Sequence, residues 1–226
     1  VATSRPSYFF LTPPARLRRA LPGRRVRALD RHGKYLIATM DSGERLLLHL
    51  GMTGQLFGSG VSSLRLLQST RGPALTPETQ AGGFVPDRHT HLRLAFEDGG
   101  PEVLFRDARK FGKVQLLAPG EEPERLRLLG RDALSARGGD LHAACRRRRV
   151  PIKTVLLDQS VLAGVGNIQA SEACFRAAID PRAPARGLDR RALGRLADAV
   201  AASIEDTIAG ITLDPDTGDY AYVNEE

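Results

Sequence analysis

Three short segments combine glycine with cationic, imidazole or apolar side chains in spacings that suit contact with a polyanion. In two of them an apolar side chain stands in an unusual place: Met52 lies between two glycines, and Phe111 directly follows two cations. Cations can hold phosphates while an apolar side chain wedges into a base stack. This pattern is typical of a protein that enters a nucleic-acid duplex. The three segments are His49–Gly54, Asp107–Gly112 and Leu162–Ile168.

Each segment also has a plain structural interpretation. Met52 can fill a core, as methionine ordinarily does, and Phe111 can fold inward beneath a surface turn. His89 and His91, which lie together before a predicted strand, can be surface imidazoles or phosphate contacts. The glycine turn at 162–168 can be a tight helix–helix connection. Alternatively, Asn167 caps the next helix, whose free N–H groups would seat a phosphate.

Arginine far outnumbers lysine among the basic residues. The chain has 33 Lys+Arg against 26 Asp+Glu, a net charge of +7, and only four of the 33 are lysines: Lys34, Lys110, Lys113 and Lys153. A GC-rich genome favours arginine and can explain this composition. A polyanion-binding surface explains it equally well, because the guanidinium fork suits phosphate. The run Arg146–Arg149 needs either an anionic partner or open solvent.

The elements that must carry these segments change type along the chain. Strand patterns predict hairpins over 35–50 and 91–105, with a third strand at 112–117 beside the second hairpin, and a long surface loop at 58–87. Helical spacing follows, with helices beginning at Pro151, at Asn167 and near residue 189. The last has an apolar stripe closed by Gly210, comprising Leu193, Leu196, Val200, Ile204 and Ile208. An α+β fold follows, with a β domain at 1–117, a linker at 118–139 and a helical domain at 140–226.

Several classes of protein are disfavoured. No apolar run approaches the roughly 20 residues of a membrane helix, and no charged-then-apolar leader indicates secretion. Cys145 and Cys174 are too few for a disulfide framework or a four-cysteine zinc site within this chain. We therefore expect a cytoplasmic protein with no membrane partner.

In their order along the chain, Arg31–Leu36, His49–Gly54, Asp107–Gly112 and Gly164–Ala173 resemble the formamidopyrimidine-DNA glycosylase / endonuclease VIII family of base-excision repair enzymes. The resemblance covers about residues 16–213. It implies an N-terminal β-sandwich and a helical domain with a helix–two-turn–helix motif, with lesion-containing duplex DNA bound between them by a monomer. It further implies glycosylase and AP-lyase activity on oxidised or ring-opened purines, the damaged base being everted into a pocket.

The resemblance also assigns roles to single residues. Lys34 matches a lysine that assists catalysis by handling protons and charge near the lesion. Glu172 matches an acidic position lining the base pocket. The positions matching side chains that fill the vacated space are Met52, Arg109 and Phe111, with Arg109 also expected to contact DNA. The positions matching phosphate contacts are His89, Arg148, Lys153 and Asn167.

The chain departs from the family pattern at both ends. The family's nucleophile is the amine of an N-terminal proline followed by glutamate, whereas this sequence starts Val1-Ala2, and Pro6 has only an amide nitrogen. The family's C-terminal zinc finger is also missing, so we expect no cofactor within this chain and zinc only through that finger. Either the chain is a fragment of a glycosylase, or it is a divergent, non-catalytic protein that binds damaged or duplex DNA. An RNA-binding module is a third, less fitting hypothesis, because the motifs suit duplex entry better than single-strand stacking.

Overall fold

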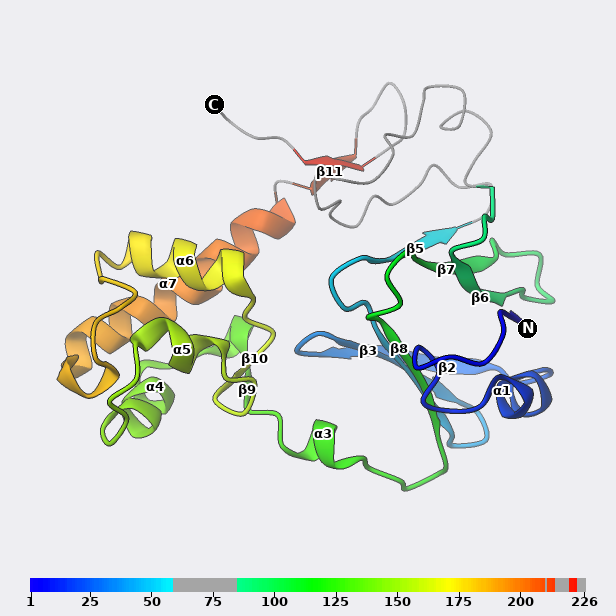
Figure 1. Ribbon diagram of the computed structural model, residues 1–226, viewed down its shortest axis with the longest axis horizontal. Helices are drawn as coiled ribbons and strands as arrows, with labels where there is room; N and C mark the ends of the chain where they lie inside the picture. Colours follow the sequence, from blue (N-terminus) through cyan, green and yellow to red (C-terminus); the bar gives the residue numbers. More distant parts are fainter. Residues whose placement is uncertain (59–84, 210, 214–219, 223–226) are drawn as a thin grey trace. The chain divides into compact units, whose positions relative to one another are not determined.

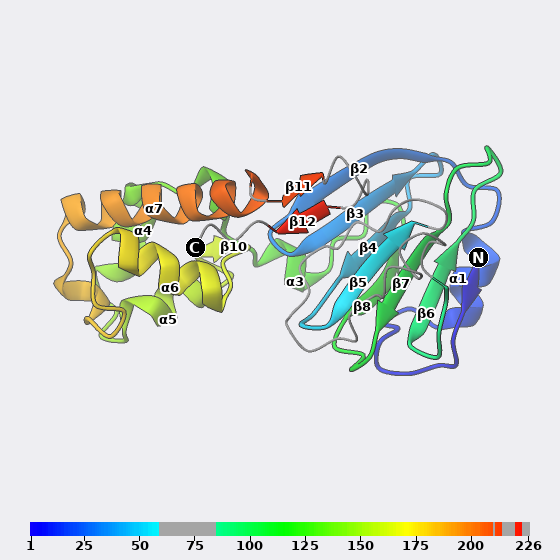
Figure 2. The ribbon, with the colours of Figure 1, turned by 90° about the horizontal axis from the view of Figure 1, so that it is seen from above.

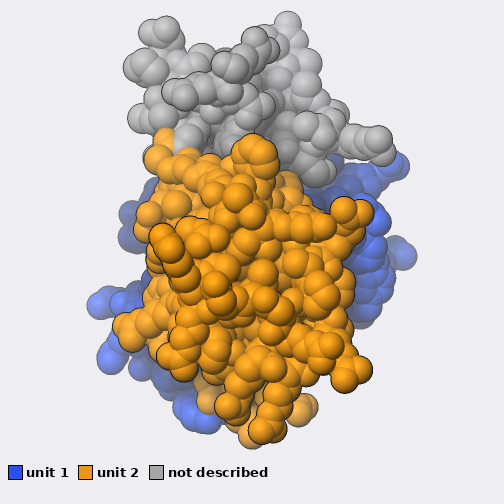
Figure 3. All heavy atoms as spheres, turned by 90° about the vertical axis from the view of Figure 1, so that its left-hand side faces the viewer, with its two compact units in different colours: residues 1–31, 35–121, 211–226 blue, residues 32–34, 122–210 orange. Residues whose placement is uncertain are grey.

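A computed structural model of the protein describes residues 1–58, 85–209, 211–213 and 220–222 (Figure 1). The chain divides into two compact units, coloured separately in Figure 3. Unit 1 comprises residues 1–31, 35–121 and 211–226, and unit 2 comprises 32–34 and 122–210. Most of the predicted loop at 58–87 lies outside the described residues, as does Gly210.

One four-stranded sheet of unit 1 is built around the first predicted hairpin. Its order is β2 (Val26–His32), β3 (Tyr35–Met40), β4 (Arg45–His49) and β8 (Lys113–Leu117). The β3–β4 hairpin is confirmed, with Leu36 opposite Leu48. The prediction that 112–117 pairs beside the second hairpin is wrong, because β8 pairs with β4, with Leu46 opposite Leu116. The loop after Asp107 carries the chain from one sheet to the other, which strand patterns alone do not reveal.

The second sheet contains the other predicted hairpin, β6 (Thr90–Leu94) and β7 (Val103–Asp107). It is extended by β1 (Ala2–Thr3) on one side and β5 (Gly54–Gly58) on the other (Figure 2). Neither β2 nor β5 is predicted from the sequence. Six of the seven residues of β2 are exposed, so it lacks apolar alternation, and β5 begins and ends with glycine.

The core of unit 1 lies between the two sheets. Leu46 and Leu116 from one sheet share a buried cluster with Leu92 and Phe105 from the other. Phe9 joins them, with its ring centroid 4.8 Å from that of Phe105 in a T-shaped pair. This arrangement confirms the β-sandwich of the predicted α+β fold. One short helix, α1 (Pro14–Ala20), adds Leu17 to the same cluster.

Unit 2 is mainly helical. The predicted helices are confirmed as α5 (Ile152–Leu157), α6 (Asn167–Arg176) and α7 (Arg190–Ala209), and α4 (Gly138–Cys145) was not predicted. Of the apolar stripe on α7, Leu193, Leu196 and Val200 are fully buried, Ile204 is partly buried, and Ile208 is exposed. The remaining elements within 118–139 are α3 (Glu124–Arg127), β9 (Arg131–Asp132) and the 3-10 turn η1 (Ala133–Ser135).

The turn between α5 and α6 differs in one detail from the expectation. The predicted cap, Asn167, is the first helical residue, and the N-cap is Gly166, whose backbone is extended and which offers no side chain. The start of α6 therefore keeps N–H groups that no side chain of its own cap satisfies. The short strand β10 (Leu162–Ala163) precedes this turn and pairs in parallel with β9. Three shorter elements complete the described chain: η2 (Ala185–Gly187), β11 (Ile211–Leu213) and β12 (Tyr220–Tyr222). None of the described helices is long and apolar enough to cross a membrane.

Candidate nucleic-acid interface

Two loops of unit 1 carry the side chains that could enter a duplex. The Met52 loop (residues 50–53) joins β4 to β5, and the Phe111 loop (residues 108–112) joins β7 to β8. Met52 is 64% exposed and Phe111 is 38% exposed, so neither fills the core. The guanidinium carbon of Arg109 lies 4.5 Å from the centroid of the Phe111 ring, a cation–π contact. An apolar tip and a cation are thus presented together on the Phe111 loop.

A single buried carboxylate joins the two loops. Asp107, the last residue of β7, has no exposed surface. Its Oδ1 accepts the Thr53 hydroxyl at 2.5 Å and the backbone N–H of Arg109 at 3.2 Å. Its Oδ2 accepts the backbone N–H of Gly112 at 2.6 Å. Through these three hydrogen bonds, Asp107 holds one residue of the Met52 loop and two residues of the Phe111 loop.

The backbones of the two loops also touch. Gly51 has φ +65°, and a Cβ added there would lie 2.7 Å from the backbone nitrogen of Gly112. A Cβ on Gly112 would lie 2.8 Å from the Phe105 ring and 2.9 Å from Oδ2 of Asp107. Only glycine fits at both positions, which explains why a glycine precedes Met52 and another follows Phe111.

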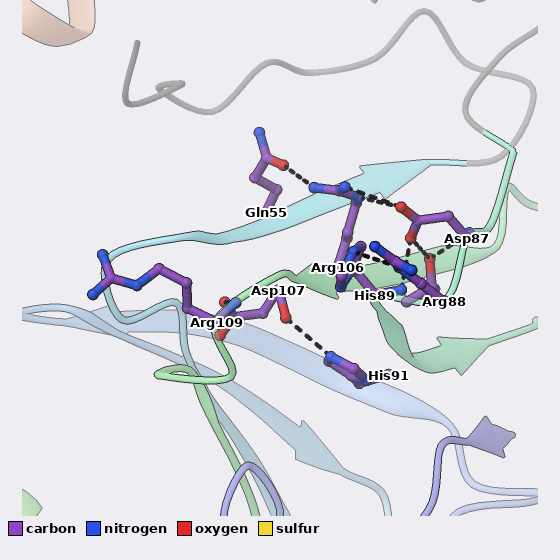
Figure 4. A network of polar contacts seen from close by, with 9 residues as sticks. Gln55, Asp87, Arg88, His89, His91, Arg106, Asp107 and Arg109 are labelled. Atoms are coloured by element: carbon purple, nitrogen blue, oxygen red, sulfur yellow. Dashed lines mark hydrogen bonds and ion pairs between the residues drawn. The ribbon is translucent and has the colours of Figure 1, made fainter. Parts of the chain in front are cut away.

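His89 is bound to the same junction through the backbone. The N–H of Asp107 donates to the carbonyl of His89 at 2.9 Å. Figure 4 shows His89 beside the ion pair of Arg106 and Asp87, whose Nη2 and Oδ2 atoms are 2.9 Å apart, while Arg109 extends away from that network. Burial tends to raise the pKa of Asp87, but hydrogen bonds from Arg106 and the His89 N–H outweigh it and hold the pKa below its usual value.

His91 is neither a surface imidazole nor a phosphate contact, because it is 2% exposed. Its Nε2 lies 3.0 Å from the carbonyl oxygen of Asp107 (Figure 4). Its Nδ1 lies 3.1 Å from the Ser4 hydroxyl. Burial lowers the pKa of His91, which favours the neutral ring. A neutral ring that donates from Nε2 to Asp107 can accept from Ser4 at Nδ1, so both contacts are satisfied.

In unit 2, Lys34 is placed by a tight turn. The turn joins β2 to β3 at Gly33, which has φ +57° and donates its N–H to Oδ2 of Asp132 at 2.9 Å. The Lys34 amine lies 3.7 Å from the point where a Cβ on Gly166 would be, so it sits beside the N-cap of α6. Although much of the residue is exposed, partial burial of the amine lowers the pKa of Lys34. The positive end of α6 acts in the same direction.

Three further predicted residues line one open groove of about 550 Å³ on α5 and α6. The Lys153 amine donates to the Ser171 hydroxyl at 2.8 Å, which aims this cation along the first turn of α6. Glu172 accepts from Nε of Arg176 at 2.7 Å, one turn further on. The residues lining the groove are Lys153, Asn167, Ile168, Ser171, Glu172 and Phe175.

Arg148 does not line this groove. Its Nη1 lies 2.7 Å from Oδ2 of Asp158 in an ion pair. The pKa of Asp158 is lowered, first by the Ser160 hydroxyl and also by Arg148, although burial opposes the shift. The neighbouring Arg146, Arg147 and Arg149 are exposed. Within the charge run, Arg148 is therefore the residue with an internal carboxylate partner.

The structure thus gathers the predicted residues into two groups. Around Asp107 in unit 1 lie Met52, His89, Arg109 and Phe111. In unit 2, Lys153, Asn167 and Glu172 share the groove, and Lys34 lies beside Gly166, the neighbour of Asn167. The sequence did not single out Asp107, which lies between a strand and a glycine-containing loop and accepts hydrogen bonds from both loops.

The β unit carries exposed apolar side chains on two loops, with Arg109 against Phe111. The helical unit carries lysines near the start of α6. These are features of a duplex-DNA-binding protein. Residues 1–114 match the family model described as the formamidopyrimidine-DNA glycosylase N-terminal domain, and residues 129–215 match the H2TH domain of the same glycosylase. The chain belongs to the formamidopyrimidine-DNA glycosylase family. The predictions of family, fold class and glycosylase enzyme class are thereby confirmed.

Individual relatives agree with this assignment. Formamidopyrimidine-DNA glycosylase of Paracoccus denitrificans is 40% identical over 207 residues, covering 91% of this chain and 68% of the relative. That of Halorhodospira halophila is 41% identical over 206 residues, covering 88% and 68%. The crystal structure of the MutM (Fpg) protein from Thermus thermophilus superposes with a TM-score of 0.71 at 28% identity, covering 96% of this chain and 71% of that one. The chain spans about two thirds of the length of these curated relatives.

Proposed function

We propose that this chain is the DNA-engaging part of a monomeric, cytoplasmic DNA glycosylase with AP-lyase activity on oxidised or ring-opened purines in duplex DNA. The observation that supports it best is the placement of Met52, His89, Arg109 and Phe111 around one buried carboxylate, in a chain that belongs to this family. A Lactococcus lactis Fpg of the same fold, with a TM-score of 0.74 at 23% identity, has been crystallised with a Fapy-dG-containing DNA.

In this proposal unit 1 holds the duplex open. Met52 and Phe111 enter the space left by the everted base, which offsets part of the cost of unstacking. Arg109 and His89 contact the adjacent phosphates, and their positive or hydrogen-bonding groups fix the register of the protein on the strand.

In this proposal unit 2 binds phosphates and supplies a group that exchanges protons. Lys153 and the open N–H groups at the start of α6 bind a phosphate near Asn167. Arg148 adds a second phosphate contact, for which its ion pair with Asp158 must rearrange or be shared. Lys34, with its lowered pKa, exchanges a proton more readily near neutral pH than an ordinary lysine. Glu172 faces the base.

The proposal draws its chemistry from side chains and backbone groups. Among the described residues, no three His, Cys, Asp or Glu side chains cluster closely enough to hold a metal ion. Zinc belongs to the proposed function only through the finger that the family carries.

Borohydride trapping tests the catalytic part of the proposal. The 226-residue chain and a longer form beginning with Pro-Glu are each incubated with duplex containing 8-oxoguanine or an abasic site, then reduced. We expect a covalent adduct from the longer form only, because the amine of an N-terminal proline forms the Schiff base that is reduced. An adduct from the 226-residue chain would contradict the expectation that the nucleophile lies outside it. No adduct from either form would favour a non-catalytic damaged-DNA-binding protein.

A further inference from the structure

The Met52 loop and the Phe111 loop are held together by hydrogen bonds and by contact of their backbones. Thr53 and Gly112 bind opposite oxygens of Asp107, and the Gly51 and Gly112 backbones leave no room for a Cβ between them. The register places Gly54 directly opposite Asp107, so the end of β7 and the start of β5 are also paired. Neither loop can shift far without breaking a bond to the same buried carboxylate.

A second set of hydrogen bonds holds the backbone of Asp107 and of the Phe111 loop. Its N–H and C=O are engaged by the His89 carbonyl and by Nε2 of His91. The Tyr8 hydroxyl donates to the carbonyl of Arg109 at 2.7 Å, which anchors the Phe111 loop from the N-terminal segment. The Asp107 carboxylate is therefore a fixed point from which the two loops are presented.

We propose that Asp107 is a positioning residue for lesion recognition, which makes Met52 and Phe111 enter the duplex as one rigid wedge. The inference rests on the proposed function and goes beyond it, because it assigns a role to a residue that never touches DNA. It predicts that the contributions of the two tips are coupled, and that the coupling passes through the Thr53–Asp107–Gly112 hydrogen bonds.

The experiment compares binding of the 226-residue chain to two duplexes, one undamaged and one carrying a tetrahydrofuran abasic-site analogue. A 2-aminopurine beside the orphaned base reports disturbed stacking by a rise in fluorescence. Asp107→Asn keeps the side-chain volume but replaces one carboxylate oxygen with an NH₂ group. That group can only donate, and it would face a donor of one of the two loops. We expect it to weaken lesion binding about tenfold and to reduce the fluorescence rise, with undamaged binding nearly unchanged.

A milder pair of variants serves if Asp107→Asn fails to fold. Thr53→Val removes only the hydroxyl that ties the Met52 loop to Asp107, and Thr53→Ser retains it. We expect Thr53→Val to lose lesion preference severalfold and Thr53→Ser to restore it. The matched control is Thr12→Val, which removes a buried hydroxyl bonded to Leu116 rather than to either loop. It should lower stability without changing the ratio of the two affinities.

A double-mutant cycle separates positioning from simple destabilisation. Met52→Ala and Phe111→Ala should combine non-additively in the native background and additively in the Thr53→Val background. One result would overturn the positioning role alone: the affinity ratio falls in Met52→Ala and in Phe111→Ala. In that result Asp107→Asn and Thr53→Val leave the ratio unchanged. No effect of Met52→Ala or Phe111→Ala would overturn both the wedge in the proposed function and this inference.

Discussion

Lys34 places a primary amine beside the open start of a helix, where partial burial and the helix dipole both disfavour its charged form. The resemblance singled out this lysine without giving a reason for its reactivity. The structure provides one, because Gly33 and Asp132 turn the chain so that the amine reaches Gly166.

The first prediction concerns the titration of Lys34. Because the chain has only four lysines, ¹³C-lysine labelling gives four signals that single substitutions can assign. We expect Lys34 to titrate below the ordinary lysine pKa of about 10.4. Between its lowered pKa and that value the unfolded chain binds more protons, so the free energy of unfolding should rise with pH in this window. Lys34→Gln should lose that rise, and a Lys34 signal titrating at or above the ordinary value would contradict the assignment.

The second prediction concerns the charge of Arg109. Arg109→Ala should weaken duplex binding and reduce the slope of log K against log salt concentration by about 0.9, since one phosphate contact and its released counterion are lost. Arg93→Ala is the matched control, because Arg93 is paired with Glu102 at 2.6 Å on β6. A salt titration in which Arg109→Ala leaves the slope unchanged would show that Arg109 does not face a phosphate.

At this scale the sequence left open whether Met52 and Phe111 lie in the core or at the surface. The exposure of the two side chains in the folded loops places them at the surface. Asp107 could not be recognised as a junction, because Thr53 is 54 residues away in the chain and the contact depends on the register of β5 against β7.

At the scale of elements, the turn between β2 and β3 belongs to unit 2 and lies against β10. Gly33 has a left-handed backbone, and a Cβ there would lie 3.0 Å from Cβ of Ala163 and 3.2 Å from the Gly164 nitrogen. The turn can approach β10 this closely only because Gly33 has no side chain.

The third prediction follows from that contact. Gly33→Ala should lower the free energy of unfolding by about 1–3 kcal/mol, because it adds both backbone strain and a collision. It should also shift the Lys34 lysine signal. Gly139→Ala is the control, since Gly139 is helical with open space around its Cβ position, and it should be neutral or stabilising. Urea denaturation measures both, and equal stabilities for the two variants would contradict the account.

The elements that sequence predicted well were those with strong local patterns. The hairpins β3–β4 and β6–β7 have apolar runs around glycine turns, and α7 has a long helical stripe. The elements it missed depend on other parts of the chain. The strand β2 is largely exposed, and β8 was assigned to the wrong hairpin because the chain changes sheets within the Phe111 loop.

At the scale of the whole molecule, the net charge of +7 indicated only that an anionic partner was possible. The structure shows that some of these charges are paired internally, as Arg93 is with Glu102 and Arg148 is with Asp158. The order of four motifs along the chain was sufficient to predict the family, and the change from strand to helical patterns was sufficient to predict the α+β fold. It was not sufficient to predict how the motifs are joined within each unit.

The ratio of two affinities of the 226-residue chain tests whether Met52 and Phe111 give it a preference for damaged duplex DNA. One is for a duplex with a tetrahydrofuran abasic-site analogue, and the other is for the same duplex undamaged, at one salt concentration. Because a vacated site costs less to open and accepts the wedge, we predict binding at least about tenfold tighter to the damaged duplex. The preference should be lost in Met52→Ala/Phe111→Ala. Equal affinities of the native chain for the two duplexes would contradict the account.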